Sequence, residues 1–201
     1  MILAFDTSSA SCTAALFDEA GACVAHKDEI IGRGHSERLV PMLDELLAGR
    51  RAETILVGVG PGSFTGIRVG IAAACGLAIG WDADVAGMSS LALIAATARS
   101  SDEVAVAISG GHGELFVQQF AGGEPTTELY NLPPAEAAKA IFAATVVGSA
   151  ARQLVEARGF GEARDLAPSA ANTLKLSAAM RSLAAKPVYA RAPDARPRQA
   201  A

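Results

Sequence analysis

The chain has 201 residues, of which 51% are hydrophobic and 19% are charged, and its formal net charge is −4. This length and composition are typical of a well-packed globular protein and exclude an intrinsically disordered chain. The negative net charge argues against strong direct binding to nucleic acid, which requires clustered lysine and arginine. A short basic tail is the local exception, and solvated tail charge is its commoner interpretation: Arg191, Arg196 and Arg198.

The cysteines and the apolar segments indicate a cytoplasmic chain. Cys12, Cys23 and Cys75 are widely spaced, with no Cys-x-x-Cys pair, so we expect each to be a reduced and buried thiol. No basic segment precedes the strand pattern that starts at Ile2, so no signal peptide is expected. The longest apolar stretch, Val69 to Trp81, is shorter than the roughly 20 residues that cross a bilayer, and it predicts a buried helix and no membrane contact.

The first half of the chain predicts three strands followed by alternating helices and strands. The strands are expected at 2–6, 12–17 and 22–31, and the short turns between them predict an antiparallel meander. A helix is expected from Ser36, as its N-cap, to Leu47, with an apolar stripe of Leu39, Met42, Leu43, Leu46 and Leu47 that Val40 widens. The run 55–59 does not alternate, as in a strand buried on both faces. A helix at 67–80, a strand at 83–87 and a helix from Ser89 or Ser90 to about Ala98 complete this half.

From Ser101 a shorter version of the same pattern restarts. Strands at 104–108 and 114–120 flank a hairpin signal, Ser109-Gly-Gly-His-Gly113. A helix is expected at 134–144, a strand at 145–148, and helices at 150–158 and 172–184. We interpret the chain as two related lobes: residues 1–100, a smaller lobe at 101–190, and a tail at 191–201.

The loop Gly60-Pro-Gly-Ser-Phe-Thr-Gly66 is the most informative local feature, because a strand, a glycine turn and a helix start can hold an anion on backbone amides. It is not a Walker A loop, since no Gly-Lys-Ser or Gly-Lys-Thr ends it. The dinucleotide fingerprint fails at Thr65, where a third glycine is needed, although Asp82 and Asp84 lie where a ribose-binding acid belongs. We favour a structural role, in which the glycines allow a tight turn and the pairs Gly66/Gly70 and Gly76/Gly80 allow close approach of another backbone.

Candidate catalytic groups are few. Asp6 is either a nucleotide or metal carboxylate or, more commonly for Asp before Ser and Thr, a turn residue. His26, His35 and His112 are isolated, so we predict no protein-held transition metal. There is no Gly-x-Ser-x-Gly elbow. The residues therefore predict no metal, no cofactor, and no set of acid, base and nucleophile.

Three stretches resemble the TsaB (YeaZ) family: Ile2-Leu-Ala-Phe-Asp-Thr-Ser-Ser9, Gly34-His-Ser-Glu-Arg-Leu39 with Pro41-Met-Leu43, and Gly58-Val-Gly-Pro-Gly-Ser-Phe-Thr-Gly-Ile-Arg-Val-Gly70. The closing Pro187-Val-Tyr-Ala-Arg191 resembles the family's ending. The resemblance is strong over residues 1–98 and weak over 120–185. It departs from the family at Ser109–Gly113, where the family commonly carries an Asp and an Arg.

The resemblance implies an α/β fold of the actin-like ATPase superfold, with two lobes of mixed sheets flanked by helices and a reduced second lobe. It implies a non-catalytic subunit of the complex that transfers threonylcarbamoyl to the adenosine beside the anticodon of ANN-decoding tRNAs. Family members pair with the catalytic paralogue TsaD, recruit the ATPase TsaE, use the threonylcarbamoyl-adenylate made by TsaC, self-associate when alone, and meet tRNA only through the complex.

The resemblance also implies functional residues. The family's dimer face is formed by the first two helices, which makes these six the expected partner-binding residues: Leu39, Leu43, Leu46, Gly70, Ala73 and Leu77. Asp6, Ser8 and Ser9 are the candidates for a vestigial nucleotide site. The alternative function is a weak standalone ATPase or kinase of the same superfold, whose phosphate loop normally carries glycine, whereas Asp6–Ser11 has none. A metalloprotease would require ligands that the sequence does not supply.

Overall fold

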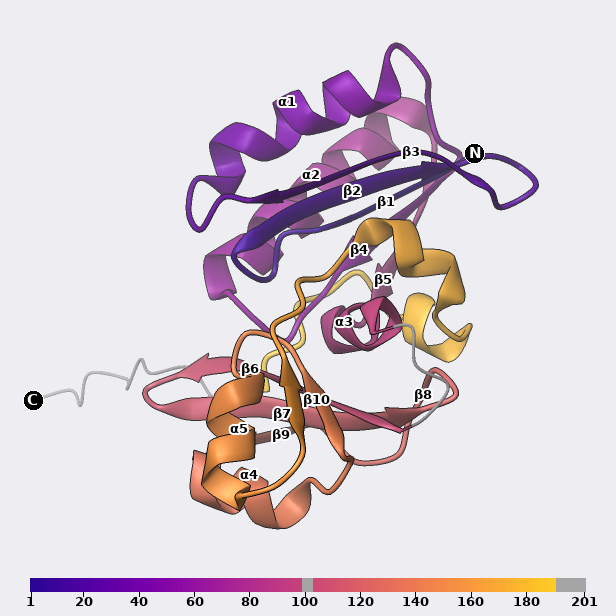
Figure 1. Cartoon of the computed structure of the whole chain (residues 1–201). Coiled ribbons are helices and arrows are strands. Elements are labelled where there is room, and N and C mark those ends of the chain that lie inside the picture. The colour runs from indigo at the N-terminus through magenta and orange to yellow at the C-terminus, as the bar shows by residue number, and fades with distance from the viewer. Residues whose placement is uncertain (99–102, 191–201) are drawn as a thin grey trace, which may run out of the picture.

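The chain folds into two lobes, each built on one β-sheet with helices beside it (Figure 1). The structure, a computed structural model, describes residues 1–98 and 103–190. The basic tail and the predicted boundary near residue 100 lie outside the described residues, so the division into domains stays a prediction. The expected α/β class with two mixed sheets is confirmed.

The first sheet has five strands in the order β3-β2-β1-β4-β5. β1 (Ile2–Asp6), β2 (Ser11–Phe17) and β3 (Cys23–Ile30) form the predicted antiparallel meander, because their turns are too short for any other connection. β4 (Thr54–Gly58) pairs in parallel with β1, and β5 (Asp84–Met88) pairs in parallel with β4. Each parallel strand is reached through a helix.

This sheet is covered on both faces, as its side chains alternate between two hydrophobic clusters. Leu3 and Phe5 of β1 point toward α1 (His35–Leu47) and α2 (Phe64–Trp81), whereas Ala4 points toward α3 (Ser90–Thr97) and the second lobe. β4 divides in the same way, with Ile55 and Val57 on one side and Leu56 on the other. The prediction that 55–59 is buried on both faces is confirmed.

Helix α1 carries the predicted stripe: Leu39, Met42, Leu43, Leu46 and Leu47 are all buried. Two details of the prediction are wrong. Val40 is 62% exposed, because it lies on the opposite face, and Ser36 is not the N-cap. The cap is Gly34, whose φ of 90° only glycine adopts easily, and the Ser36 hydroxyl instead donates to Glu37.

Helix α2 is not the buried helix that its composition predicts. Only Gly66, Ile67, Gly70 and Ala74 are buried, along one narrow stripe. By length and composition alone, α2 could cross a membrane, but a single helix of this kind is weak evidence for a membrane span. In the fold, α2 is the crossover connection between the parallel strands β4 and β5, and it packs on β4.

The second lobe is smaller and contains the predicted hairpin. Its sheet has the order β11-β10-β6-β7-β8, with β9 pairing on β7. The strands are β6 (Val104–Gly111), β7 (Glu114–Ala121), β8 (Glu124–Pro125), β9 (Tyr130–Leu132), β10 (Thr145–Val147) and β11 (Glu162–Arg164). The helices are α4 (Pro134–Ala140) and α5 (Ala151–Arg158). α4 ends four residues earlier than the expected 144, and the Gln119 side chain accepts hydrogen bonds from the freed amides of Phe142 and Ala143.

The helix predicted at 172–184 is wrong. This stretch forms two 3₁₀ helices, Ala170–Lys175 and Ala179–Arg181, and then an extended strap over residues 182–190 that returns to the first lobe (Figure 1). Leu183 pairs with Gly87 of β5, and the Val188 amide donates to the Val59 carbonyl at 2.8 Å. A Cβ on Gly87 would lie 2.6 Å from the Ala184 carbonyl oxygen, so glycine is needed for this approach.

Candidate functional site

The glycine loop closes on the first turn of the chain. The Ser63 amide donates to the Ser8 carbonyl at 2.6 Å, and the Thr7 hydroxyl donates to the Gly66 carbonyl at 2.7 Å. A Cβ on Gly62 would lie 2.1 Å from the Ser8 oxygen, and one on Gly66 would lie 2.0 Å from the Thr7 oxygen. Both positions therefore require glycine, and the structural interpretation of this loop is confirmed.

The two helical glycine pairs have different roles. Gly66 and Gly70 face the core of their own lobe, where a Cβ on Gly70 would lie 2.6 Å from the Thr7 hydroxyl oxygen. Gly76 and Gly80 face outward, with no atom within 4 Å of the corresponding Cβ positions. Only the second pair leaves room for another backbone from outside the chain.

Asp6 is a turn residue. Its side chain is fully buried; one carboxylate oxygen accepts from the amide and the hydroxyl of Ser8, both at 2.7 Å. The other oxygen accepts from the Ser90 hydroxyl at 2.5 Å, and Ser90 in turn accepts from the Gly60 amide. Asp6 thus ties the first turn, the glycine loop and α3 together. Of the three vestigial candidates, Ser8 and Ser9 line the cleft described next, and Asp6 is not part of its lining.

A cleft of about 1200 Å³ lies between the two lobes. Its walls come from the first turn (8–11), the start of α2, the β6–β7 hairpin, the segment after β11 (165–168) and the end of the strap (188–190). Within the departure from the family pattern, Ser109–Gly113, the first four residues line this wall, and Gly111, His112 and Gly113 are all at positive φ. Sequence reasoning identified the first turn and the hairpin separately but had no signal that 165–168 joins them.

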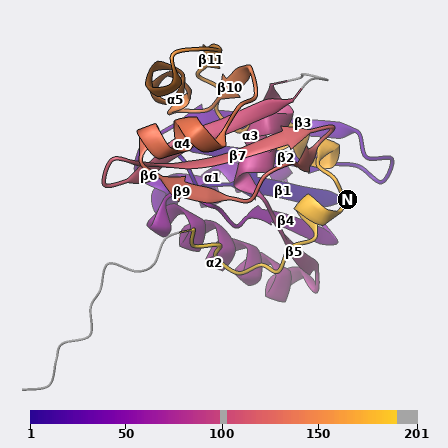
Figure 2. The ribbon, with the colours of Figure 1, turned by 90° about the horizontal axis from the view of Figure 1, so that it is seen from below.

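At the mouth of the cleft, the strap is held to α2 by a cluster of three side chains. The Phe64 and Tyr189 rings stack with centroids 5.3 Å apart. The Arg68 guanidinium lies 3.5 Å above the Phe64 ring, and its Nε donates to the Tyr189 hydroxyl at 2.9 Å. Figure 2 shows the closing segment running beside α2. Tyr189, in the stretch Pro187–Arg191 that resembles the family's ending, therefore holds the strap on α2. Arg191 lies outside the described residues.

The predicted partner-binding residues lie mostly inside the chain. Leu39, Leu43 and Leu46 are no more than 3% exposed, and Gly70 packs on Thr7 and Val57. Ala73 and Leu77 are partly buried against the same cluster. These side chains hold α1 and α2 on their own sheet, so a partner on this face would meet other residues first. That the two helices form a partner face stays a prediction.

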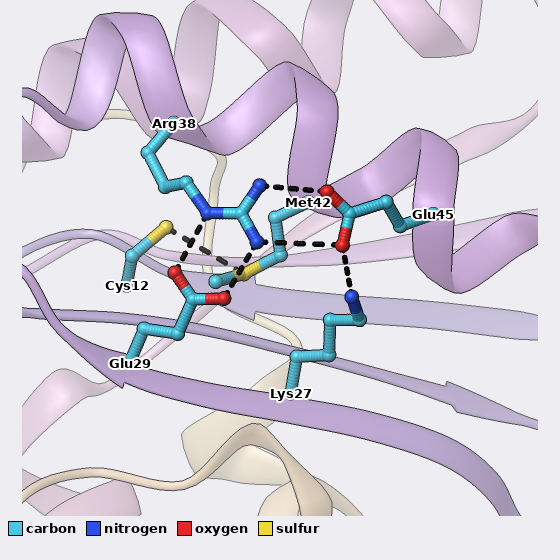
Figure 3. A network of polar contacts seen from close by, with 6 residues as sticks. All are labelled: Cys12, Lys27, Glu29, Arg38, Met42 and Glu45. Atoms are coloured by element: carbon cyan, nitrogen blue, oxygen red, sulfur yellow. Dashed lines mark hydrogen bonds and ion pairs between the residues drawn. The ribbon is translucent and has the colours of Figure 1, made fainter.

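A network of charged side chains fastens α1 to β3 (Figure 3). Arg38 contacts Glu29 through two nitrogens, both at 2.6 Å, and also Glu45, which pairs with Lys27. Hydrogen bonds from Arg38 and Lys27 lower the pKa of Glu45 to about 2, and the bond from Arg38 also lowers the pKa of Glu29. The network keeps these carboxylates charged and α1 fixed on the sheet.

The cysteines differ from the prediction. Cys12 is buried beneath this network beside Met42, and burial raises the pKa of its thiol to about 11. Cys23 and Cys75 are exposed, so the prediction of three buried thiols is wrong for these two, which lie at the edge of β3 and on the outer face of α2. All three thiols are free.

Comparisons with known proteins agree on one group. The model of the family "TsaD: tRNA N6-adenosine threonylcarbamoyltransferase" matches residues 27–142. The protein "tRNA threonylcarbamoyladenosine biosynthesis protein TsaB" of Haemophilus influenzae is 36% identical over 126 residues, covering 59% of this chain and 52% of the relative. Its Escherichia coli counterpart is 34% identical over 131 residues, covering 61% and 56%. The chain thus matches about half the length of these curated relatives.

A solved structure extends the likeness to the whole fold. The structure of YeaZ from Pseudomonas aeruginosa superposes with a TM-score of 0.79 at 31% identity, covering 94% of this chain and 98% of that one. The two mixed sheets with their helices and the cleft between the two lobes define a two-lobed α/β protein. Within that class, the chain belongs to the TsaB (YeaZ) family.

Proposed function

We propose that this chain is a non-catalytic, partner-binding subunit in the biosynthesis of threonylcarbamoyladenosine in tRNA. The observation that carries the proposal is the outer face of α2. Ala72, Cys75, Gly76, Ile79 and Gly80 are all exposed, and Ile79 is 86% exposed. A soluble domain rarely leaves such an apolar face uncovered unless a partner covers it, and small residues allow that partner to come close.

The placement of Asp6 supports a non-catalytic role. Its three hydrogen bonds to Ser8 and Ser90 occupy both carboxylate oxygens, so the group is committed to holding the turn together. The glycine loop is likewise closed on Thr7 and Ser8 and presents its tight turns to the protein itself. These contacts weigh against the alternative of a standalone ATPase or kinase, whose phosphate loop must stay open to the ligand.

The partners follow from the family. We propose that the chain pairs through α1 and α2 with a TsaD-type catalytic paralogue, that the pair recruits a TsaE-type ATPase, and that TsaC supplies the threonylcarbamoyl-adenylate. Alone, it forms a homodimer through the same face. We propose that the complex is cytoplasmic. The complex, and not this subunit alone, holds the tRNA, because the net charge of −4 gives the single subunit little attraction for phosphates.

Co-purification with the TsaD-type paralogue tests the proposal. Ile79→Asp places a charge in the exposed α2 face, and Gly76→Trp fills the open space there, so both variants should lose the paralogue and the homodimer while keeping the wild-type fold. Phe142→Asp is the matched control, since Phe142 is 64% exposed on the second lobe. If both α2 variants fold, still dimerise and still bind the paralogue, this face is not the interface.

A further inference from the structure

We propose that β3 is an interaction edge, along which a second copy of this chain adds its own β3 in the antiparallel direction. The strand is the outermost one of the first sheet, and among residues 1–98 and 103–190 no strand pairs with its outer side. Its open backbone groups therefore offer a template to another strand. This contact is separate from the proposed one through α2, because α2 packs on β4 in the interior of the sheet.

The edge lacks the usual backbone devices that keep other strands away. Natural sheets protect their edges with very short strands, prolines and bulges. β3 has eight residues and contains no proline. Its ladder with β2 shifts register between Leu16 and Phe17, at the start of β3, and then runs evenly from Ala25 to Ile30. Most of the strand is therefore regular enough to accept a partner.

Charged side chains are the remaining protection, and on β3 they are bonded within the chain. Lys27 and Glu29 are held against α1 by the network in Figure 3. Asp28 points to the opposite face, where its carboxylate accepts from the hydroxyls of Thr13 and Ser169. These contacts offset the charges that would otherwise repel an incoming strand.

The face of β3 turned away from α1 is exposed and carries groups that complement one another. Val24, His26, Asp28 and Ile30 alternate onto this face, and all four are exposed. Val24 is 44% and Ile30 is 71% exposed, although both are large and apolar. The strand thus presents an apolar side chain near each end, with a base and an acid between them.

Antiparallel pairing centred on Lys27 makes the strand complementary to itself. Val24 then lies opposite the partner's Ile30, and His26 lies opposite the partner's Asp28. A carboxylate has about four acceptor sites, so the two hydrogen bonds to Asp28 leave room for a third. The neighbouring registers, centred on His26 or on Asp28, place two imidazoles or two carboxylates opposite each other. Cross-strand pairs of this kind stabilise a sheet, and like charges directly opposite destabilise it.

One strand pair is a small interface, and small interfaces are weak and transient. We therefore expect the β3 contact to form only as the protein concentration rises, above the range in which the α2 contact forms.

Sedimentation velocity at increasing concentrations of the Ile79→Asp chain, which removes the α2 contact, tests the inference. This chain should be monomeric when dilute and should dimerise toward millimolar concentration. Val24→Lys and Ile30→Asp, each added to this background, should weaken the association by about tenfold, because each removes both apolar pairs of the symmetric dimer. An equimolar mixture of the two should associate again, since the new lysine then faces the new aspartate and the other apolar pair is intact.

Phe142→Asp in the same background is the matched control, because Phe142 is 64% exposed on the second lobe, and it should dimerise like the background. Circular dichroism and thermal unfolding check that every variant is folded. The inference is overturned if the Ile79→Asp chain stays monomeric near millimolar concentration, if either strand variant dimerises as the background does, or if the mixture associates no better than its components. A dimer that persists in the dilute Ile79→Asp chain contradicts the α2 contact instead, and the strand variants and their mixture still decide the β3 contact.

Discussion

Adding one methyl group to Gly70 and to Gly76, two positions of the same helix, should change stability in opposite directions. Gly→Ala in a helix is worth about 0.5–1 kcal/mol by itself, because alanine loses less backbone entropy. At Gly76 no atom lies within 4 Å of the new methyl, so Gly76→Ala should gain that full amount.

At Gly70 the same methyl would lie 2.6 Å from the Thr7 hydroxyl oxygen and 3.4 Å from a Val57 methyl. Ordinary carbon contacts are about 3.5–4.0 Å, so Thr7 must move. Thr7 is fully buried and its hydroxyl donates to Gly66, so moving it risks a hydrogen bond worth about 0.5–1.5 kcal/mol in addition to about 1–3 kcal/mol of overpacking. After subtracting the helix gain, Gly70→Ala should be destabilised by about 0.5–4 kcal/mol.

Urea unfolding followed by circular dichroism measures both values, at two protein concentrations so that self-association is separated from folding. Gly80→Ala, also in open space, should repeat the gain of Gly76→Ala. Equal effects at 70 and 76, or a gain at 70, would refute the assignment of Gly70 to the core. The same reasoning applies to Leu39→Asp and Leu43→Asp, which place a charge in the core and so report on folding before they report on any interface.

Three further predictions follow from single contacts. Glu29 and Glu45 have lowered pKa values, so their contribution to stability is present above the unfolded pKa of about 4.5 and is lost as the pH falls through their folded pKa values, which is about 2 for Glu45; an Arg38→Met variant should show a smaller loss of stability in acid titrations. Cys75 should be alkylated by iodoacetamide at pH 8 much faster than Cys12, whose thiol has a pKa of about 11 and is buried, and peptide mass spectrometry would contradict this if Cys12 reacted first. Tyr189→Phe should lose only the hydrogen bond to Arg68, about 0.5–1.5 kcal/mol at most, whereas Tyr189→Ala should also lose the ring stack with Phe64. Equal melting temperatures for the two variants would show that the stack contributes nothing to stability.

The periodicity of the sequence was enough to predict most of the first lobe. The meander, the stripe on α1 and the doubly buried β4 each follow from the spacing of apolar residues along a short stretch of sequence. Short strands such as β8 and β11 have two or three residues and leave too little pattern to find. The segment 172–184 carries a helical composition, but its backbone is used to bind β5 and α3, and that tertiary demand is invisible in the local sequence.

The site could be predicted only in part. The glycine run marked the right loop, since tight turns and close packing need glycine wherever they occur. Which glycines face inward and which face outward depends on how α2 sits on β4, so the sequence could not show that Gly70, one of the expected partner-binding residues, packs on Thr7 of its own lobe. The cleft joins loops separated by more than a hundred residues, from Ser8 to Tyr189, and no local pattern records that they meet.

The bridge between Leu183 and Gly87 has a consequence for how the protein is made. β5 is an edge strand, and the strap supplies the partner for its free backbone groups at Gly87. During synthesis, β5 leaves the ribosome about a hundred residues before Leu183 does, at ≈ 5–20 residues per second, so the first sheet waits several seconds with an open edge. A fragment ending near residue 98 would keep that edge permanently and should aggregate, although it contains every strand of its sheet. Residues translated long after β5 thus complete the edge of the first sheet.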